Sequence, residues 1–430
     1  MEAASASRDP KPNRQLRRER ELRGWSQRKV ADEIGTNIDT VSKWERGINI
    51  PDPHFREKLC ALFGRNALEF GFIEAQVASL SHNDQEMTLE ADRVEGALIP
   101  ARFLSMENEE LINRYISEKD NFLELKTDAI EWTIPEVVVF DNTKRCLPIN
   151  AINVQVDRSC KEYEIPAKIA GRAEDILEEI ERYFYDSTTI RLNKIENNDH
   201  GITLTVTKAH YLQFVATNYA MDVVLPQKGW TRSLRDVVHP NTQLCQLEES
   251  LLCNHIGVGV LVFTLDNYLV IPVRSKENIA TWQQSIGPSI AGATSYDDDM
   301  WSLKAGPVAS WMREGREELG LENSDFLEEN DVFLGITRDL LRGGKPDMYF
   351  ATQLNITRKK LEQKFNKARD KWESTELRWL EFTNPLIPPS TVQERLTFLH
   401  EFTNLLNLHQ SQLSRPAQTN FTFWFKYMMS

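Results

Sequence analysis

Residues 313–321 read REGREELGL, and this stretch decides how the C-terminal part of the chain is interpreted. An α-helix turns by about 100° per residue, so Glu314, Glu317 and Glu318, at positions i, i+3 and i+4, share one helix face. Carboxylates gathered in this way repel one another, and a divalent cation would offset the repulsion. Mg²⁺ and Mn²⁺ are hard ions that prefer oxygen ligands. The stretch therefore predicts a helix that holds Mg²⁺ or Mn²⁺.

The same stretch resembles the signature helix of the Nudix hydrolases, whose pattern reads R-E-apolar-x-E-E-x-G-apolar. The resemblance implies that Glu314, Glu317 and Glu318 are metal ligands. It also implies that Glu317 and Glu318 act in catalysis together with Arg313, which orients them. The implied substrate is a nucleoside diphosphate linked to another group. The alternative interpretation is a surface helix with a solvated acidic face.

Two positions depart from the Nudix pattern. Gly315 occupies the apolar position, where glycine costs about 1 kcal/mol in helix propensity. Ala305 stands where the family has a further glutamate. The leading glycine of the family corresponds to Gly292, which implies an insertion over residues 295–301. Asp297, Asp298 and Asp299 in this insertion are expected to be a solvent loop rather than a metal site.

The sequence around the stretch favours the same fold. Residues 257–264 and 268–274 are two apolar, β-rich runs separated by three residues, which predicts a hairpin. Later segments that read as strands are 331–336, 348–354 and 376–382. Nudix domains carry such a hairpin before the signature helix, so the resemblance extends over about residues 250–385. It implies an α/β/α sandwich around a mixed sheet. The general base is not assigned, and the candidates are Asp339, Asp347 and Glu376.

A second module lies near the N-terminus, where residues 25–53 read WSQRKVADEIGTNIDTVSKWERGINIPDP. Ser26 and Asn37 are predicted to cap two short helices, and Gly35 to end the first of them. Val41 and Trp44 are spaced to face inward from the second helix. Two short helices joined by a tight turn predict a helix-turn-helix.

This module resembles the repressors of the lambda and Cro type, by residues that include Leu16, Arg20, Gln27, Ala31, Gly35, Val41, Trp44, Glu45 and Gly47. The resemblance implies a structural salt bridge between Arg20 and Glu45. Residues expected to contact DNA bases are Ile38, Asp39, Thr40 and Lys43, and those expected to contact phosphates are Gln27 and Asn49. The alternative is a helical protein-interaction module without DNA binding. Residues 11–29 hold eight Lys and Arg against two Glu, which favours DNA.

Charge is distributed unevenly over the 430 residues, whose formal net charge is −13. Residues 1–80 carry 14 basic and 12 acidic side chains, a net charge of +2, which leaves −15 for the remainder. An acidic body repels DNA, so DNA contact is expected at the N-terminal module alone. The five cysteines are scattered without paired metal spacing, and neither an apolar run long enough to span a membrane nor a signal peptide is recognised. A reduced cytoplasm is the expected setting.

The predicted fold class is multidomain, an all-α helix-turn-helix bundle followed by α/β structure. The expected boundaries are a disordered N-terminus at 1–11, the helix-turn-helix domain at 12–77, a polar linker at 78–94, an α/β region at 95–249, the Nudix-like domain at 250–388, and a C-terminal helix and tail at 389–430. The α/β region is interpreted as an extension of the Nudix domain, with an independent dimerisation or ligand domain as the alternative. His210 and His255 are expected to be core histidines.

Together these features predict a DNA-binding transcriptional regulator whose Nudix-like domain binds a nucleoside diphosphate-linked metabolite. One alternative is an active metal-dependent hydrolase with a self-regulating DNA-binding head. Another is an interaction scaffold with neither activity. The expected partners are double-stranded DNA, a nucleotide-type small molecule and a second copy of the chain in a homodimer. The expected cofactor is Mg²⁺ or Mn²⁺.

Overall fold

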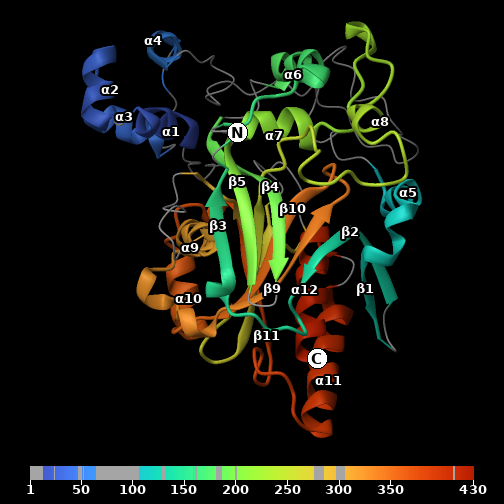
Figure 1. The fold of residues 1–430 in the computed structure, drawn as a ribbon. Coiled ribbons are helices and arrows are strands. Elements are labelled where there is room, and N and C mark those ends of the chain that lie inside the picture. The colour runs from blue at the N-terminus through green and yellow to red at the C-terminus, as the bar shows by residue number, and fades with distance from the viewer. Residues whose placement is uncertain are drawn as a thin grey trace, which may run out of the picture. The chain divides into compact units, whose positions relative to one another are not determined.

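The computed structural model describes residues 13–23, 25–46, 51, 53–63, 106–127, 131–157, 159, 162–180, 186–198, 201–275, 285–296, 306–409 and 412–430. The chain divides into two compact units, Met1–Arg93 and Val94–Ser430, which we call the head and the body. Figure 1 follows the chain by colour from the blue head to the red C-terminal helices of the body. None of the helices within these ranges is both long and apolar enough to cross a membrane.

The head is helical, as the sequence predicts. Its helices are α1 (Arg14–Leu22), α2 (Gln27–Ile34), α3 (Ile38–Glu45) and α4 (Pro53–Phe63). The side chain of Ser26 accepts a hydrogen bond from the N–H of Lys29, and the side chain of Asn37 caps α3 in the same way. Gly35 ends α2 in the left-handed conformation with φ of 74°, which glycine adopts without strain. These caps hold α2 and α3 in the predicted helix-turn-helix.

The core of the head is formed by one face of each helix. Its buried members are Leu16, Val30, Ala31, Ile34, Val41, Trp44, Leu59 and Phe63. Residues three or four positions apart lie on the same helix face, so this spacing gives α2 and α3 one apolar side each. The small side chain of Ala31, 1% exposed, lies where α2 packs on α3.

A large mixed sheet organises the body. Its strand order is β1-β2-β9-β10-β6-β7-β11, and β8 also pairs with β6. Its strands are β1 (Phe122–Lys126), β2 (Glu131–Asp141), β6 (Gly257–Phe263), β7 (Tyr268–Arg274), β8 (Ile290–Ala293), β9 (Val332–Asp339), β10 (Lys345–Gln353) and β11 (Ser374–Glu381). The pairing of β10 with β6 is parallel and the others are antiparallel.

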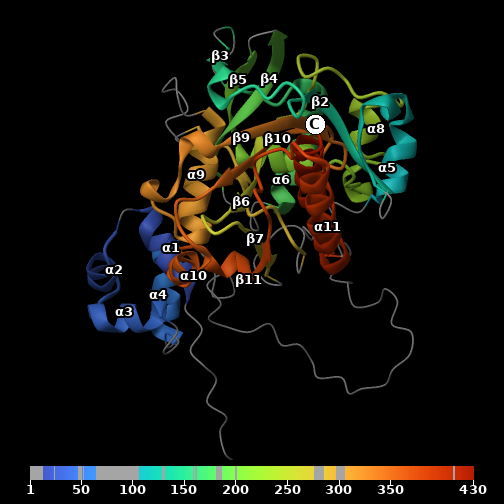
Figure 2. The same ribbon diagram turned by 90° about the horizontal axis from the view of Figure 1, so that it is seen from below.

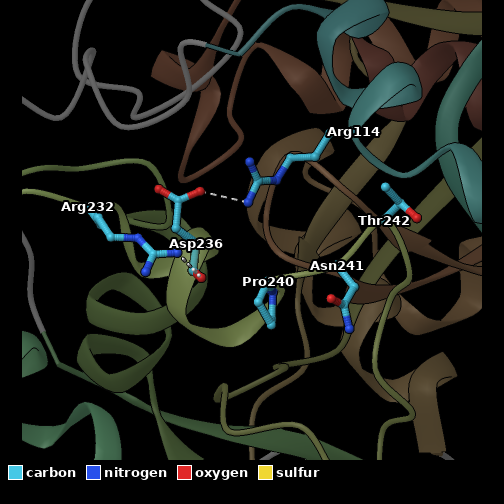
Figure 3. A pocket seen from close by; sticks show the side chains of 6 residues that line it. All are labelled: Arg114, Arg232, Asp236, Pro240, Asn241 and Thr242. Carbon is cyan, nitrogen blue, oxygen red and sulfur yellow. Dashed lines mark hydrogen bonds and ion pairs between the residues drawn. The ribbon is translucent and has the colours of Figure 1, made fainter.

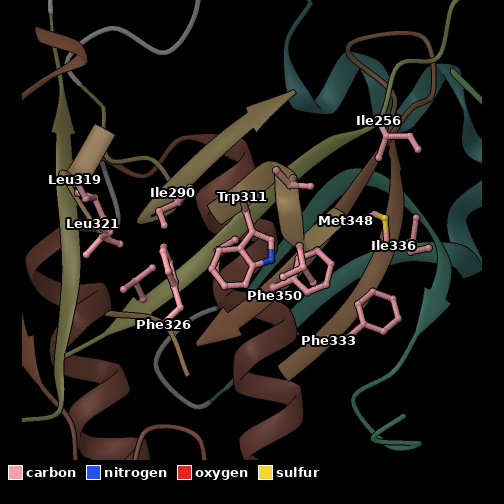
Figure 4. Close-up of a cluster of buried hydrophobic side chains, with 14 of the residues drawn as sticks. Ile256, Ile290, Trp311, Leu319, Leu321, Phe326, Phe333, Ile336, Met348 and Phe350 are labelled. Carbon is pink, nitrogen blue, oxygen red and sulfur yellow. The ribbon is translucent and has the colours of Figure 1, made fainter. Parts of the chain in front are cut away.

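A smaller sheet with the order β3-β5-β4 covers one face of the large sheet (Figures 1 and 2). Its strands are β3 (Ile152–Val156), β4 (Thr188–Asn198) and β5 (Gly201–His210). Ile190 and Leu204 from this sheet share a core with Val260 and Phe350 from the large sheet. Trp311 of helix α9 (Gly306–Leu319) lies in the middle of that core, as Figure 4 shows.

The opposite face of the large sheet is covered by two C-terminal helices, α11 (Val392–His409) and α12 (Arg415–Met428). Phe398 and Phe402 of α11 and Trp424 of α12 pack on Phe263 and Phe382. The remaining helices are α5 (Asn108–Arg114), α6 (Ala167–Ile180), α7 (Tyr211–Phe214), α8 (Leu234–Val238) and α10 (Arg358–Phe365). Short turns of 3-10 or π-helix lie at Ile116–Asn121, Ile149–Ala151, Val215–Tyr219, Pro226–Lys228, Asn323–Asp325, Glu328–Asn330 and Lys371–Glu373.

Several sequence expectations are refined by these pairings. The strands expected at 257–264 and 268–274 are both present, but their only paired positions are Phe263 and Leu269. The strand β7 instead pairs along its length with β11, and β8 pairs with the first half of β6. The segment at 95–249 supplies β1 and β2 to the large sheet, so its described part belongs to the same compact unit as the described part of residues 250–388. The aromatic tail is the buried helix α12.

Candidate functional site

A buried ion pair joins α1 to α3 in the head. Arg20 Nε lies 2.6 Å from Glu45 Oε1, and Arg20 Nη2 lies 3.0 Å from Glu45 Oε2. Both residues are less than 10% exposed. Two parallel N–H···O bonds fit the planar guanidinium to the carboxylate. The predicted structural salt bridge is therefore confirmed. Gln27 Nε2 donates to the same carboxylate at 2.7 Å, so its amide supports the ion pair between Arg20 and Glu45.

The first turn of α3 presents the residues that we expect at the base edges. Ile38 is 38% exposed, and Asp39 and Lys43 form an exposed ion pair of 2.6 Å. The hydrogen bond from Lys43 holds the pKa of Asp39 below its ordinary value. Thr40 Oγ1 donates to Asn37 Oδ1 at 2.9 Å, which fixes its rotamer. Ile38, Asp39 and Thr40 thus lie in the first turn of α3 and Lys43 lies one turn further on, whereas Asn49 lies outside the described residues.

In the body, α9 carries Glu314, Glu317 and Glu318 on its side nearest to β8. A Cβ atom added to Gly292 of β8 would stand 2.1 Å from Glu314 Oε1. Such a distance is impossible for nonbonded atoms, so glycine is required beneath Glu314. Glu318 accepts a hydrogen bond from the backbone N–H of Ala291. The short strand β8 therefore positions two of the three carboxylates.

The departure from the Nudix pattern at Gly315 has a packing explanation. A Cβ atom at Gly315 would lie 2.9 Å from Ile290 Cδ1, 3.2 Å from Phe326 Cζ and 3.3 Å from Leu321 Cδ1. The space that a side chain at position 315 would fill is thus occupied by these three neighbours. Figure 4 shows Ile290, Leu321 and Phe326 on one side of Trp311. The glycine lets α9 approach the sheet closely.

Two arginines organise the third carboxylate. Arg313 Nη2 lies 2.9 Å from Glu314 Oε1, and Arg313 Nη1 lies 3.1 Å from Glu317 Oε2. The guanidinium also donates to the carbonyl oxygen of Ala293 at 3.0 Å. Arg369 Nη1 binds the other oxygen of Glu317 at 2.9 Å. Arg313 therefore connects two glutamates to β8, the position expected of an orienting residue.

A fourth carboxylate, which the sequence analysis missed, belongs to Glu373. It ends the short helix Lys371–Glu373 just before β11. The carbonyl oxygen of Glu373 accepts a hydrogen bond from Ser275 N–H at 2.8 Å, and the N–H of Asp370 donates to the carbonyl oxygen of Glu317 at 2.8 Å. The segment is thereby fastened between β7 and α9. Glu376, one of the three candidates for the general base, is exposed and paired with Arg378.

The carboxylates at α9 share an unusual electrostatic environment. Burial, together with the charges of Glu317 and Glu373, raises the pKa of Glu314 to about 8, against the lowering effect of Arg313. Burial also raises the pKa of Glu318 well above its ordinary value, again with Glu373 and Glu314 contributing. The pKa of Glu373 is raised by burial as well. Each of these groups therefore holds a proton more tightly than an exposed glutamate.

The donor set suits a hard divalent cation, because all four side chains offer carboxylate oxygens. Within the described residues, no three Asp, Glu, His or Cys side chains are drawn close enough together to hold an ion. The ion pairs of Arg313 and Arg369 hold Glu317 in its present position. An incoming cation would have to displace a proton from Glu314 or Glu318 and rearrange these pairs. Arg274 lies beside the cluster, and its buried Nε finds no hydrogen-bond partner in the described residues.

The other candidates for a general base lie in a separate buried ionic cluster. Burial alone would raise the pKa of Asp339, but Arg342 and Arg415 hold it below its ordinary value. Arg342 Nε lies 2.5 Å from Asp339 Oδ2, and Asp347 is paired with Lys345. These carboxylates are thus already neutralised by buried cations.

The two histidines differ from each other. His255 is 4% exposed and stacks on Phe214 with ring centroids 3.8 Å apart, as expected of a core histidine. His210 does not fit that expectation, because its side chain is 30% exposed. Its ring nitrogens lie 2.7 Å from both Asp186 Oδ2 and Glu162 Oε1. It binds two carboxylates at the surface because β5 ends there. Asp297, Asp298 and Asp299 lie outside the described residues.

A pocket elsewhere in the body is lined by Arg114, Arg232, Asp236, Pro240, Asn241 and Thr242 (Figure 3). Its volume is about 240 Å³. Arg114 Nη2 binds Asp236 Oδ1 at 2.8 Å across it. None of the residues that the sequence analysis singled out lines this pocket.

Comparison with known proteins identifies one part of the chain. Residues 16–70 match the family model for a helix-turn-helix, so a helix-turn-helix region precedes the mixed α/β body. A comparison with curated proteins found no match. Among similar solved structures is that of DR0079 from Deinococcus radiodurans, with 14% sequence identity and a TM-score of 0.21. The similarity covers 37% of this chain and 82% of that one. A TM-score this low carries no argument about fold or function.

Proposed function

We propose that this protein is a DNA-binding transcriptional regulator whose body binds a nucleoside diphosphate-linked metabolite together with Mg²⁺ or Mn²⁺. The family match over residues 16–70 supports the DNA-binding part. The part of the proposal that concerns the body rests on the geometry of α9 and its neighbours. The single observation that carries this part is the pair of buried carboxyl groups on α9, Glu314 and Glu318, whose pKa values are raised by burial and by the charge of Glu373.

The head would read DNA with the first turn of α3. The ion pair between Arg20 and Glu45 is buried, so neither charge is available at the surface to contact DNA. Its role is to set the angle between the helices that it joins. Ile38 and Thr40 offer methyl groups suited to thymine, and Asp39 offers an acceptor suited to cytosine. Lys43 keeps the local charge balanced while Asp39 faces the groove. We expect a homodimer that reads two half-sites an integral number of helical turns apart.

In the body, the proposed ligand site uses the buried carboxyl groups, which would give up their protons when the cation binds. Glu314, Glu318 and Glu373 would hold the cation, which when bound polarises the diphosphate and lowers the pKa of water. Arg313 would keep Glu314 and Glu317 turned toward β8, as its ion pairs do now. Arg274, whose Nε is buried without a partner in the described residues, is suited to a phosphate oxygen. An unpaired buried donor costs about 1–3 kcal/mol, which a bound phosphate would recover.

Calorimetry with Mn²⁺ tests the metal part directly. Glu318→Gln removes one negative charge with almost no change in volume, so we expect at least about tenfold weaker Mn²⁺ binding. The exposed Glu376→Gln removes the same charge three residues beyond Glu373 and should leave binding unchanged. Wild-type protein that binds no divalent cation would eliminate the metal site.

Hydrolysis is the second candidate activity, favoured by one observation. A protein that only senses a metabolite gains nothing from three carboxyl groups, Glu314, Glu318 and Glu373, whose pKa values are raised by burial and by neighbouring carboxylates. A screen of nucleotide metabolites by thermal shift, with and without Mg²⁺, would identify ligands. Metal-dependent release of a nucleoside monophosphate from such a ligand would identify a hydrolase with a DNA-binding head. Binding without release would identify a sensor.

The two parts of the proposal are joined by allosteric coupling. A ligand that binds the body differently in the free and DNA-bound states must change operator affinity by a reciprocal factor. An ordinary coupling is about 1–3 kcal/mol, or roughly 5–150-fold in affinity. Operator affinity should be measured at fixed salt with the best ligand from the screen, for the full chain and for residues 1–80. Equal affinity with and without ligand in the full chain would refute the sensor.

A further inference from the structure

The pocket between α5 and α8 is built differently from the carboxylate site. Its lining comes from Arg114 at the end of α5, from Arg232 and Asp236 around α8, and from the segment that follows α8 (Figure 3). All of these residues lie in the part of the body that precedes the Nudix-like segment. The pocket is therefore separate from the carboxylate site, and its function has to be inferred from its own lining residues.

The single carboxylate of the pocket is fully engaged. Asp236 Oδ1 accepts from Arg114 Nη2 at 2.8 Å. Asp236 Oδ2 accepts from the N–H of Ser233 at 3.1 Å and from its hydroxyl at 2.9 Å. These bonds hold the pKa of Asp236 below its ordinary value, against the effect of burial. The carboxylate thus serves to fix Arg114 and to cap α8, and a cation is not its partner.

The arginines of the pocket have N–H groups available to donate to a ligand. Arg114 Nε is buried and finds no hydrogen-bond partner in the described part of the chain. Arg232 is exposed, and its guanidinium makes one hydrogen bond, from Nη2 to the carbonyl oxygen of Asp236 at 3.2 Å. Beneath it, Arg172 donates to the carbonyl oxygen of Arg232 and lies 4.4 Å over the ring of Trp230. Asn241, at the rim, adds an amide group.

The pocket has a net positive charge, whereas the chain around it has a net negative charge. Among the residues that line the pocket, Arg114 and Arg232 carry two positive charges and Asp236 carries one negative charge. The chain beyond residue 80 has a net charge of −15. A positively charged concavity in an acidic protein focuses its field on small anions.

We propose that this pocket binds the phosphate group of a small metabolite, a second ligand site independent of the carboxylate site. The fork of a guanidinium matches phosphate oxygens, and two arginines from different elements would grip the group from two sides. Pockets for drug-sized ligands measure roughly 300–1,000 Å³, so a volume of about 240 Å³ suits a small phosphate ester or inorganic phosphate. Bound there, the phosphate adds a bridge between α5 and α8 to the one that Arg114 already makes with Asp236.

A phosphate bridge between Arg114 and Arg232 would affect α5, the helix that carries Arg114. The helix α5 is the first described element of the body after the head. Asn108 at its start accepts a hydrogen bond from Arg415 of α12. A phosphate that fastens Arg114 to Arg232 would therefore stabilise the element through which the chain enters the body.

Calorimetric titration of the full chain with inorganic phosphate, at constant ionic strength, tests the proposal. We expect saturable binding that weakens at least about fivefold in Arg232→Gln, because one guanidinium contact is lost. Arg232→Lys keeps the charge without the fork and should fall between the two. Arg232 is exposed with a single bond to a carbonyl, so the thermal unfolding of both variants should match that of the wild type.

The matched control is Arg145→Gln, which removes the same charge from another exposed arginine, one that binds Asn197 and the carbonyl oxygen of Asn198. Its phosphate affinity should equal that of the wild type. A titration with acetate distinguishes phosphate from carboxylate recognition, and acetate should bind at least about fivefold more weakly. Phosphate binding that is absent, or equal in the wild type and Arg232→Gln, would overturn the site. Acetate binding as tight as phosphate binding would overturn the ligand class.

Discussion

Glu314 lies directly over Gly292, so close that a Cβ atom on the glycine would stand 2.1 Å from the carboxylate oxygen Oε1. Gly292→Ala must therefore push Glu314 away from β8 or shift α9. Introducing such a methyl group into a packed site costs typically about 1–3 kcal/mol. We expect a lower midpoint of thermal unfolding and weaker Mn²⁺ binding in the same variant.

The control for this prediction is Gly171→Ala in α6, where nothing lies within 4 Å of the added Cβ atom. Alanine stabilises a helix interior relative to glycine by about 0.5–1 kcal/mol, so this variant should be slightly more stable. Unchanged stability and unchanged Mn²⁺ affinity in Gly292→Ala would show that Glu314 is not held as described.

Glu373→Gln separates two roles for the residue that sequence reasoning missed. If Glu373 holds the cation, the variant binds Mn²⁺ at least about tenfold more weakly. If its charge only raises the pKa values of Glu314 and Glu318, the variant releases their protons more easily and binds the cation as tightly or better. We expect weaker binding, measured by calorimetry at pH 7 beside the exposed control Glu376→Gln.

Stability should fall as pH rises through the neutral range. Glu314 releases its proton near 4.5 in the unfolded chain and near 8 in the folded protein. Between these values the folded state holds the extra proton, so the free energy of unfolding declines by up to about 1.4 kcal/mol per pH unit for this group. Chemical unfolding in EDTA from pH 5 to 8 measures the decline.

Saturating Mn²⁺ should remove part of that decline, because the cation takes the place of the proton on Glu314. Glu136, whose pKa burial also raises to about 8, lies in the ionic cluster with Asp339 and Asp347 and should titrate in the same way with or without Mn²⁺. Glu314→Gln should flatten the pH dependence and leave the Glu136 part. A slope that neither Mn²⁺ nor this substitution changes would contradict the assignment.

Lys43→Ala should weaken specific DNA binding by about 1–3 kcal/mol, the usual value of a direct base contact. The substitution removes a donor and leaves Asp39 unpaired at the DNA surface. Thr40→Ala should lower affinity by a smaller amount. Fluorescence anisotropy with an operator selected from genomic DNA measures both.

The matched control is Lys29→Ala, since Lys29 forms the same exposed pair with Glu33 at i,i+4 and 2.6 Å, on α2 instead of α3. It should reduce nonspecific binding and the salt dependence while leaving sequence preference intact. Equal loss of specific binding in Lys29→Ala and Lys43→Ala would remove α3 from its assigned role. Failure of the selection to enrich any sequence would refute operator binding altogether.

Local patterns were sufficient wherever the physical signal is local. Ser26, Asn37 and Gly35 determine the ends of α2 and α3 through bonds within three or four residues, so the helix-turn-helix was predictable. The apolar runs at β6 and β7 predicted two strands for the same reason. Their partners were not predictable, because β7 pairs with β11 about a hundred residues later. Glu373 escaped notice because only tertiary contacts bring it to α9, and no spacing in the sequence marks it.

The strand β9 has a neighbour on each side, β10 and β2, and its pairing with β2 joins residues about two hundred positions apart. Such distant pairing forms late in folding, because the entropy cost of closing a long loop must be met before the strands gain their favourable contacts. Until then β9 exposes a row of unpaired backbone groups, which can template pairing with another chain. A fragment that begins at residue 250 would keep that edge permanently open. Production of the body as an isolated segment should therefore include β1 and β2, or aggregation will compete with folding.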